Sequence, residues 1–215
     1  SLMSEAGIAH LFDRVREVRE GNCRQFPPEN LRDALPNMTF TIPGKTTFRH
    51  STLAVIGQVI SADKGPAYAH AGDDVLVRTD FDSPSAAERT VDVHMSVDET
   101  YGQEEPLDSV MFRMGLLNSR EPALFIDGLA GLGRIVAVLD TRHSRHHGDE
   151  LIPAEQGALL GRIDADGALS FPGLVNEVEF VAHLSSLDAF RAAAAEPALV
   201  VEIDYTEPDE PEDRP

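Results

Sequence analysis

The chain contains no tryptophan, and aromatic residues make up only 6% of its 215 residues. Proteins that bind single-stranded nucleic acid stack its bases on aromatic side chains, so this scarcity argues against such a platform. A single cysteine, Cys23, excludes an internal disulfide framework. The absence of disulfides favours a reducing compartment, and we predict a cytoplasmic location.

Basic residues are also scarce, because 18 Lys and Arg stand against 37 Asp and Glu, for a formal net charge of −19. The segment 207–215 holds five acids and one arginine, which leaves 32 acidic and 17 basic residues, a net charge of −15, in the rest. Such a surface repels phosphate backbones, so we predict no nucleic-acid partner. The segment 207–215 is too acidic and too proline-rich to fold, and we predict a disordered tail.

No apolar run approaches the roughly 20 residues of a membrane span. No basic segment followed by an apolar one opens the chain, so we expect no signal peptide, with Met3 as the native start. The composition, with 42% hydrophobic and 26% charged residues, is typical of a folded globular domain. We therefore predict a soluble protein without a membrane partner.

The clearest positive signal is the run TVDVHMSVDET at 90–100. Val91, Val93, Met95 and Val97 alternate with Asp92, His94, Ser96 and Asp98. A period of two predicts a strand with one buried face and one solvated face.

Several further runs have the composition of strands. Residues 52–60 and 134–140 are apolar at nearly every position, which predicts central strands buried on both faces, and Gly57 suggests a bulge in the first. Residues 63–66 are read as a turn, and Asp166-Gly167 predicts a hairpin. The other predicted strands are 38–42, 75–79, 109–114, 158–164, 168–171, 178–183 and 199–205.

Two longer helices are predicted near the ends of the chain. Residues 5–20 carry an apolar stripe at helical spacing and end before Gly21, and we expect the stripe to dock on the core. Ser185 or Ser186 caps a second helix that runs to about Ala195. Pro122 fits the first turn of a shorter helix between them.

The predicted fold class is mainly β with peripheral helices. About eight antiparallel strands with short connections favour an OB-like or curled antiparallel β-barrel, flanked by the N-terminal and C-terminal helices. The predicted organisation is a single domain over 1–206, followed by the tail 207–215.

Three segments resemble the netrin-like domains of the tissue inhibitors of metalloproteinases. They are STLAVIGQV at 51–59, RTVDVHMSVDETYG at 89–102 and GLGRIVAVLD at 131–140. The resemblance spans roughly residues 50–171 and implies an OB-like barrel, an arrangement that many uncharacterised bacterial proteins share. The inhibitors use an N-terminal cysteine and disulfides, whereas this chain has only Cys23, so no inhibitory residue carries over.

The segment TRHSRHHGDE at 141–150 gathers the ligand types of zinc or nickel. We take His143, His146, His147 and Asp149 as candidate metal ligands. The segment lacks the HExxH pattern of a zinc hydrolase, and Arg142 and Arg145 oppose cation binding, so a solvated loop is the competing interpretation. Asp164 and Asp166 suggest part of a calcium loop, but a hairpin turn accounts for them. Cys23 has no activating motif nearby.

No catalytic signature stands out, and two hypotheses remain open. The first is a non-catalytic binding or accessory module for an unknown protein or small-molecule partner, without a cofactor. The second is a small metal-dependent hydrolase or metal-binding protein that uses the His-rich segment 141–150. A closed pocket or an occupied metal site would distinguish them.

Overall fold

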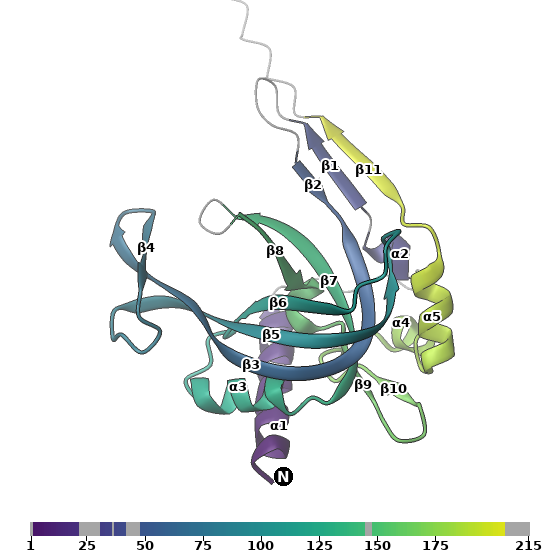
Figure 1. Ribbon diagram of the computed structural model, residues 1–215, viewed down its shortest axis with the longest axis horizontal. Helices are drawn as coiled ribbons and strands as arrows, with labels where there is room; N and C mark the ends of the chain where they lie inside the picture. Colours follow the sequence, from purple (N-terminus) through teal and green to yellow (C-terminus); the bar gives the residue numbers. More distant parts are fainter. Residues whose placement is uncertain (1, 22–30, 36, 42–47, 145–147, 205–215) are drawn as a thin grey trace, which may run out of the picture.

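The computed structural model describes residues 2–21, 31–35, 37–41, 48–144 and 148–204. Within these ranges the chain is mainly β with helices around the sheets, as predicted (Figure 1). Cys23 and the predicted tail 207–215 lie outside the described residues. None of the helices in the described ranges is long and apolar enough to cross a bilayer.

The larger of two sheets has eight strands in the described residues, and every pairing in it is antiparallel. Its path runs β10-β9-β7-β3-β5-β6, while β4 pairs with β3 and β8 pairs with β7. The strands are β3 (Thr52–Gly72), β4 (Val75–Thr79), β5 (Ala86–Tyr101), β6 (Ser109–Gly115), β7 (Arg134–Ser144), β8 (Gly148–Pro153), β9 (Leu160–Ile163) and β10 (Leu169–Ser170).

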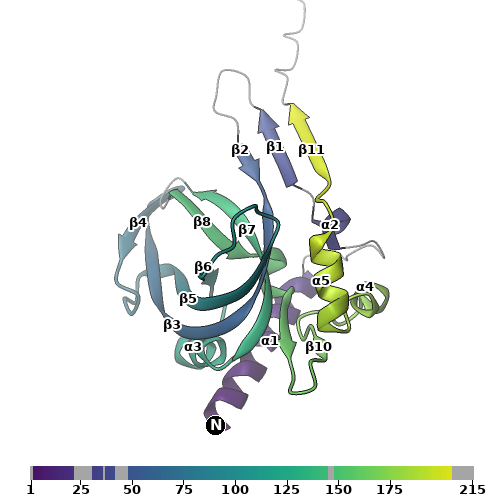
Figure 2. The ribbon, with the colours of Figure 1, turned by 45° about the vertical axis from the view of Figure 1, so that its right-hand side comes forward.

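A smaller sheet extends away from the larger one, as Figure 2 shows. It contains β1 (Asn37–Thr41), β2 (Phe48–His50) and β11 (Val200–Asp204) in the order β11-β1-β2. The β1 and β11 strands pair in parallel, so the last strand of the described chain lies beside its first strand. The helices are α1 (Leu2–Gly21), α2 (Leu31–Ala34), α3 (Pro122–Ala130), α4 (Val178–Ala182) and α5 (Leu187–Ala195), with the short 3-10 helix η1 (Ala154–Gly157).

The alternation in residues 90–100 is confirmed in β5. Val91, Val93 and Met95 are almost completely buried, whereas His94 is exposed and Asp92 is half-buried. Val93 lies opposite Phe112 of β6 in the ladder, and both side chains are fully buried. Cross-strand pairs of this kind hold the sheet together through apolar contact.

The two predicted central strands are neighbours in the sheet, where β3 pairs with β7. Residues 53–56 and 135–139 are buried on both faces, because helices cover each side. One core packs α1 and α3 against the face that carries Val55 and Ile135. A second core packs α2, α4 and α5 against the face that carries Ile56 and Val136. Figures 1 and 2 show the two helical groups on opposite sides of the strands.

The large sheet is strongly curled because its longest strand is interrupted by bulges. The pairing of β3 with β5 shifts register between Ile56 and Gly57 and at three further places along the strand. Each bulge bends a strand and increases its twist. At Gly57 a Cβ atom would lie 2.0 Å from the Ser96 carbonyl oxygen, so the predicted bulge requires glycine.

A closed barrel is not confirmed. The hydrogen-bonded path in the described residues ends at β6 on one side, and no ladder joins β6 to β8. Arg113 of β6 instead reaches Glu150 of β8 through an ion pair of 3.2 Å. The supported description is therefore a curled antiparallel sheet with flanking helices.

Several local predictions are confirmed with small changes in their bounds. The N-terminal helix covers Leu2–Gly21, and Leu11, Phe12 and Val15 of its stripe are buried in the first core. Ser186 caps α5, since its side chain accepts a hydrogen bond from the Ala189 N–H. The hairpin at Asp166-Gly167 forms between β9 and β10, where the Asp164 carboxylate accepts the N–H groups of Asp166 and Ala168.

Two local predictions are wrong. Residues 178–182 form helix α4 instead of a strand, because Phe180 and Leu184 are buried one helical turn apart while Val178 is 74% exposed. The expected turn at 63–66 lies inside β3. A register shift between Lys64 and Ala67 accommodates Pro66, which has no N–H to donate to a ladder.

Candidate ligand-binding site

The candidate site is an open hollow of about 630 Å³ at one end of the large sheet. Its walls come from β3 to β8, from the last turns of α1, and from the segment that follows β6. Pockets that bind small molecules usually measure about 300–1,000 Å³. The hollow therefore has the size of a ligand site, and no short sequence motif could have revealed it because its walls come from many elements.

Two pairs of residues with left-handed backbone frame this hollow. Leu117 and Asn118 have φ of 50° and 58°, and Glu155 and Gln156 have φ of 50° and 57°. Leu117, Asn118 and Gln156 line the hollow. Left-handed conformations of residues other than glycine cost on the order of 1–3 kcal/mol each and concentrate at functional sites. Both pairs therefore contribute to the lining of one hollow.

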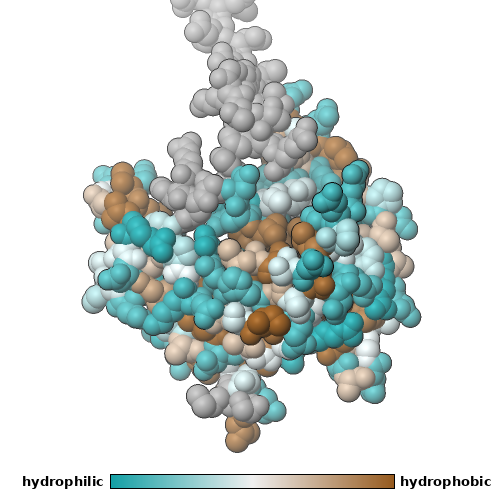
Figure 3. All heavy atoms as spheres, viewed as in Figure 1, coloured by the Kyte–Doolittle hydropathy of each residue, from teal (hydrophilic) through white to brown (hydrophobic). Residues whose placement is uncertain are grey.

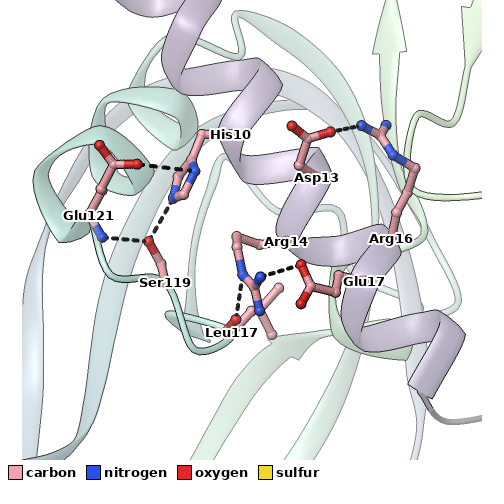
Figure 4. A network of polar contacts seen from close by, with 8 residues as sticks. All are labelled: His10, Asp13, Arg14, Arg16, Glu17, Leu117, Ser119 and Glu121. Atoms are coloured by element: carbon pink, nitrogen blue, oxygen red, sulfur yellow. Dashed lines mark hydrogen bonds and ion pairs between the residues drawn. The ribbon is translucent and has the colours of Figure 1, made fainter.

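Side chains from α1 hold the first of these turns, as Figure 4 shows. The Arg14 Nε–H donates to the Leu117 carbonyl at 2.9 Å, and His10 Nε2 lies 2.6 Å from Ser119 Oγ. The Ser119 N–H donates to the Leu116 carbonyl at 2.9 Å and closes the turn. The helix thus fixes a turn that leucine and asparagine would otherwise avoid.

Ser119, His10 and Glu121 lie together but do not form a convincing nucleophilic triad. Glu121 Oε2 is 3.9 Å from His10 Nδ1, beyond hydrogen-bond distance, and its side chain is 66% exposed. Ser119 Oγ also accepts the Glu121 N–H at 3.1 Å, a contact that stabilises the start of α3. These contacts explain the position of the turn without any catalysis.

A half-buried ion-pair network includes two residues that line the hollow, Arg113 and Glu150. Arg113 donates to both oxygens of Asp92, at 2.7 and 3.2 Å, and to Glu150 at 3.2 Å. The Asp92 hydrogen bonds are the main reason that the pKa of Arg113 is raised above its ordinary value. Bidentate pairs of this kind are strong and directional. The network joins β5, β6 and β8 across the gap where the ladder is missing.

Two of the predicted metal ligands, His143 and Asp149, lie on the hairpin that contributes Arg142 and Glu150 to this hollow. Residues 141–144 and 148–150 of the segment expected to be a loop belong to β7 and β8, in which His143 pairs with Asp149 and Arg142 pairs with Glu150. Arg142 and Glu150 line the hollow, whereas the exposed Asp149 does not. His146 and His147 lie outside the described residues. In the described part of the chain no group of three metal-binding side chains comes together. Zinc or nickel binding stays a prediction.

A second polar cluster joins the two sheets. Asp140 Oδ1 is buried without a hydrogen-bond partner and lies 3.7 Å from His50 Nδ1. Burial raises the pKa of the Asp140 carboxyl, and the attraction of His50 opposes this rise only in part. Such a carboxylate reduces stability when it is ionised, because desolvation disfavours the charged form.

We expect Asp140→Asn to raise the thermal midpoint at pH 8. A pKa that is raised in the folded state means that ionisation destabilises the fold above that pKa, and that this penalty disappears below the unfolded value of about 3.9. The gain should therefore shrink as the pH falls through the folded pKa, which thermal melts from pH 8 to pH 4 would measure. Asp98→Asn, at a carboxylate that is 59% exposed, is the matched control and should show no comparable gain. A gain from Asp140→Asn that grows toward acid pH would contradict this account.

No protein-family model matches the chain, and no curated protein or solved structure is significantly similar to it.

Proposed function

We propose that the protein is a non-catalytic binding module that holds a small molecule in the hollow between β4, β6 and β8. The observation that carries this proposal is the pair of left-handed turns at the walls of the hollow. A fold retains strained backbone where the strain serves a purpose, and shaping a ligand site is such a purpose. The turn at Leu117 and Asn118 is held by Arg14 and by the His10–Ser119 contact, so this wall of the hollow is formed before a ligand arrives.

Further features support a small ligand over a macromolecule. On the face that Figure 3 shows, hydrophobic surface occurs in separate patches between hydrophilic side chains. Broad partner surfaces usually present a larger continuous apolar area. The proposal includes no nucleic-acid partner, which the net charge of −19 supports. It also includes a cytoplasmic location, for which the single cysteine is the supporting observation. It also includes an OB-like barrel architecture, supported by the curl of the large sheet.

Blocking the hollow is the direct test of this proposal. Gly115 lines the hollow, and a Cβ atom placed on it would meet nothing within 4 Å. Gly115→Leu should therefore fill the space without disturbing the fold. We expect neutral benzamide to shift the amide resonances of Asn118 and Ile152 in the wild type, and Gly115→Leu to abolish these shifts.

The control for this test lies on the same strand. Ser109 is exposed on β6 and does not line the hollow, so Ser109→Leu adds the same side chain elsewhere. This variant should retain the benzamide shifts. Shifts that are scattered over the surface, or that persist in Gly115→Leu, would contradict a ligand site in the hollow.

A further inference from the structure

We infer that the hollow selects an organic oxyanion, a carboxylate or a phosphate monoester attached to an apolar body, and that Arg89 and Arg142 recognise its charge. This inference rests on the proposed function and names the chemical class of its ligand. It starts from an unexpected charge distribution. In a chain of net charge −19, the charged side chains that line the hollow are three arginines and two glutamates.

Ion pairing leaves part of this positive charge without a counterion. Arg113 is satisfied by Asp92 and Glu150, and one arginine with two carboxylates gives this network a formal charge of −1. Arg89 and Arg142 make no ion pair with a carboxylate in the part of the chain that the structure describes. The Glu150 carboxylate, which could serve Arg142 across the β7–β8 ladder, is held by Arg113. The exposed Glu88 and the one carboxylate in excess in the Arg113 network match the charge of Arg89 and Arg142, but in the described residues neither forms an ion pair with these two arginines.

Arg89 is held in place by contacts that leave one of its nitrogens free. Its Nε–H donates to the Phe81 carbonyl at 2.6 Å, and Nη2 donates to the Ser83 carbonyl at 2.9 Å. The guanidinium also lies over the Phe81 ring, 5.9 Å from its centroid. These contacts hold the guanidinium in place through neutral carbonyl groups, so its charge is not paired with a carboxylate. Its Nη1 makes no contact with protein acceptors in the described residues. A half-buried, pre-oriented arginine suits carboxylate and phosphate oxygens.

Other residues that line the hollow favour a ligand with an apolar part. Leu76, Leu116 and Ile152 contribute apolar surface, and Tyr68 contributes an aromatic ring. A free inorganic anion would leave this surface in contact with water, whereas an aliphatic or aromatic body would cover it. The combination therefore favours a small organic acid over a bare ion.

The test compares probes that share a shape and differ in charge. Wild-type protein is titrated with benzoate, phenyl phosphate and benzamide at low salt, and the affinities are taken from NMR shifts of the residues that line the hollow. We expect both anions to bind more tightly than benzamide, and their ratio shows whether a carboxylate or a phosphate is preferred. Arg142→Gln should weaken both anions about tenfold, since a charge-assisted hydrogen bond contributes roughly that factor, and should leave benzamide unchanged.

Arg120→Gln is the matched control, because Arg120 is exposed, lies just beyond the turn and does not line the hollow. It removes the same charge and should change each affinity less than twofold. Equal binding of benzoate and benzamide, or an unchanged anion affinity in Arg142→Gln, would overturn the inference about the anion. Neither result would contradict the proposal that the hollow binds a small molecule. If none of the three probes shifts the residues of the hollow, both the inference and the proposed function are wrong.

Discussion

Val93→Asp should unfold the protein or bring it close to unfolding. Val93 is fully buried in the first core and faces Phe112 across the β5–β6 ladder. A carboxylate at this position would lose its hydration without gaining a partner, which costs several kcal/mol. Stabilities of folded domains amount to only about 5–15 kcal/mol, so this cost takes a large share of the total. Urea denaturation would show a much lower midpoint than that of the wild type. If the variant does not accumulate as soluble protein, this would also indicate a loss of stability.

The neighbouring substitution Asp92→Val is the natural comparison. Asp92 lies on the opposite face of β5 and its side chain is 22% exposed. Its loss removes the bidentate contact with Arg113, but Glu150 remains beside the guanidinium. We expect a cost of about 1–3 kcal/mol, the range for lost hydrogen bonds to charged groups. Equal urea midpoints for the two variants would refute the register of β5. Val93→Ala separates the effect of the charge from that of the lost volume.

Gly128→Ala should destabilise the protein strongly, although it adds only one methyl group. The α1 and α3 helices cross at two glycines, and a Cβ atom on Gly128 would lie 2.2 Å from the Gly7 carbonyl oxygen. The obstacle is backbone, and it cannot move aside because Leu11 and Leu129 are fully buried around the crossing. Overpacking of this kind costs about 3 kcal/mol, which exceeds the gain of up to about 1 kcal/mol from replacing a helical glycine with alanine.

Differential scanning calorimetry would measure this effect as a fall of roughly 6–12 °C in the thermal midpoint. Gly21→Ala is the control, because a Cβ atom there would have nothing within 4 Å, and its midpoint should stay close to that of the wild type. Gly7→Ala should destabilise similarly, with a Cβ atom 2.6 Å from the Gly128 nitrogen. The double variant should cost less than the sum, since one substitution already separates the helices. A neutral Gly128→Ala would show that the helices do not approach so closely.

The elements that could be predicted from the residues alone are those whose signal is local and repeated. The strand at residues 90–100 was predictable because burial on one face of a strand imposes a period of two. The N-terminal helix was predictable because its buried stripe imposes a helical period. The Asp166-Gly167 hairpin and the Ser186 cap were also readable, since backbone geometry there depends on one or two side chains. The wrong prediction of a strand at 178–182 also came from a local pattern. Over five residues the periods of strand and helix are hard to separate, and the tertiary contacts of Phe180 decided the outcome.

The candidate site depends on contacts between residues that are far apart in the sequence. Arg113, Asp92 and Glu150 belong to three strands, and no spacing along the chain indicates that they meet. Arg89 and Arg142 lie 53 positions apart and line one hollow only because the bulges of β3 curl the sheet. The left-handed turn at Leu117 and Asn118 could not be predicted either, because it is held by Arg14 of α1, 103 positions earlier in the chain. Local periodicity reports which face of an element is buried, whereas a ligand site depends on how distant elements meet, and that is set by packing across the whole chain.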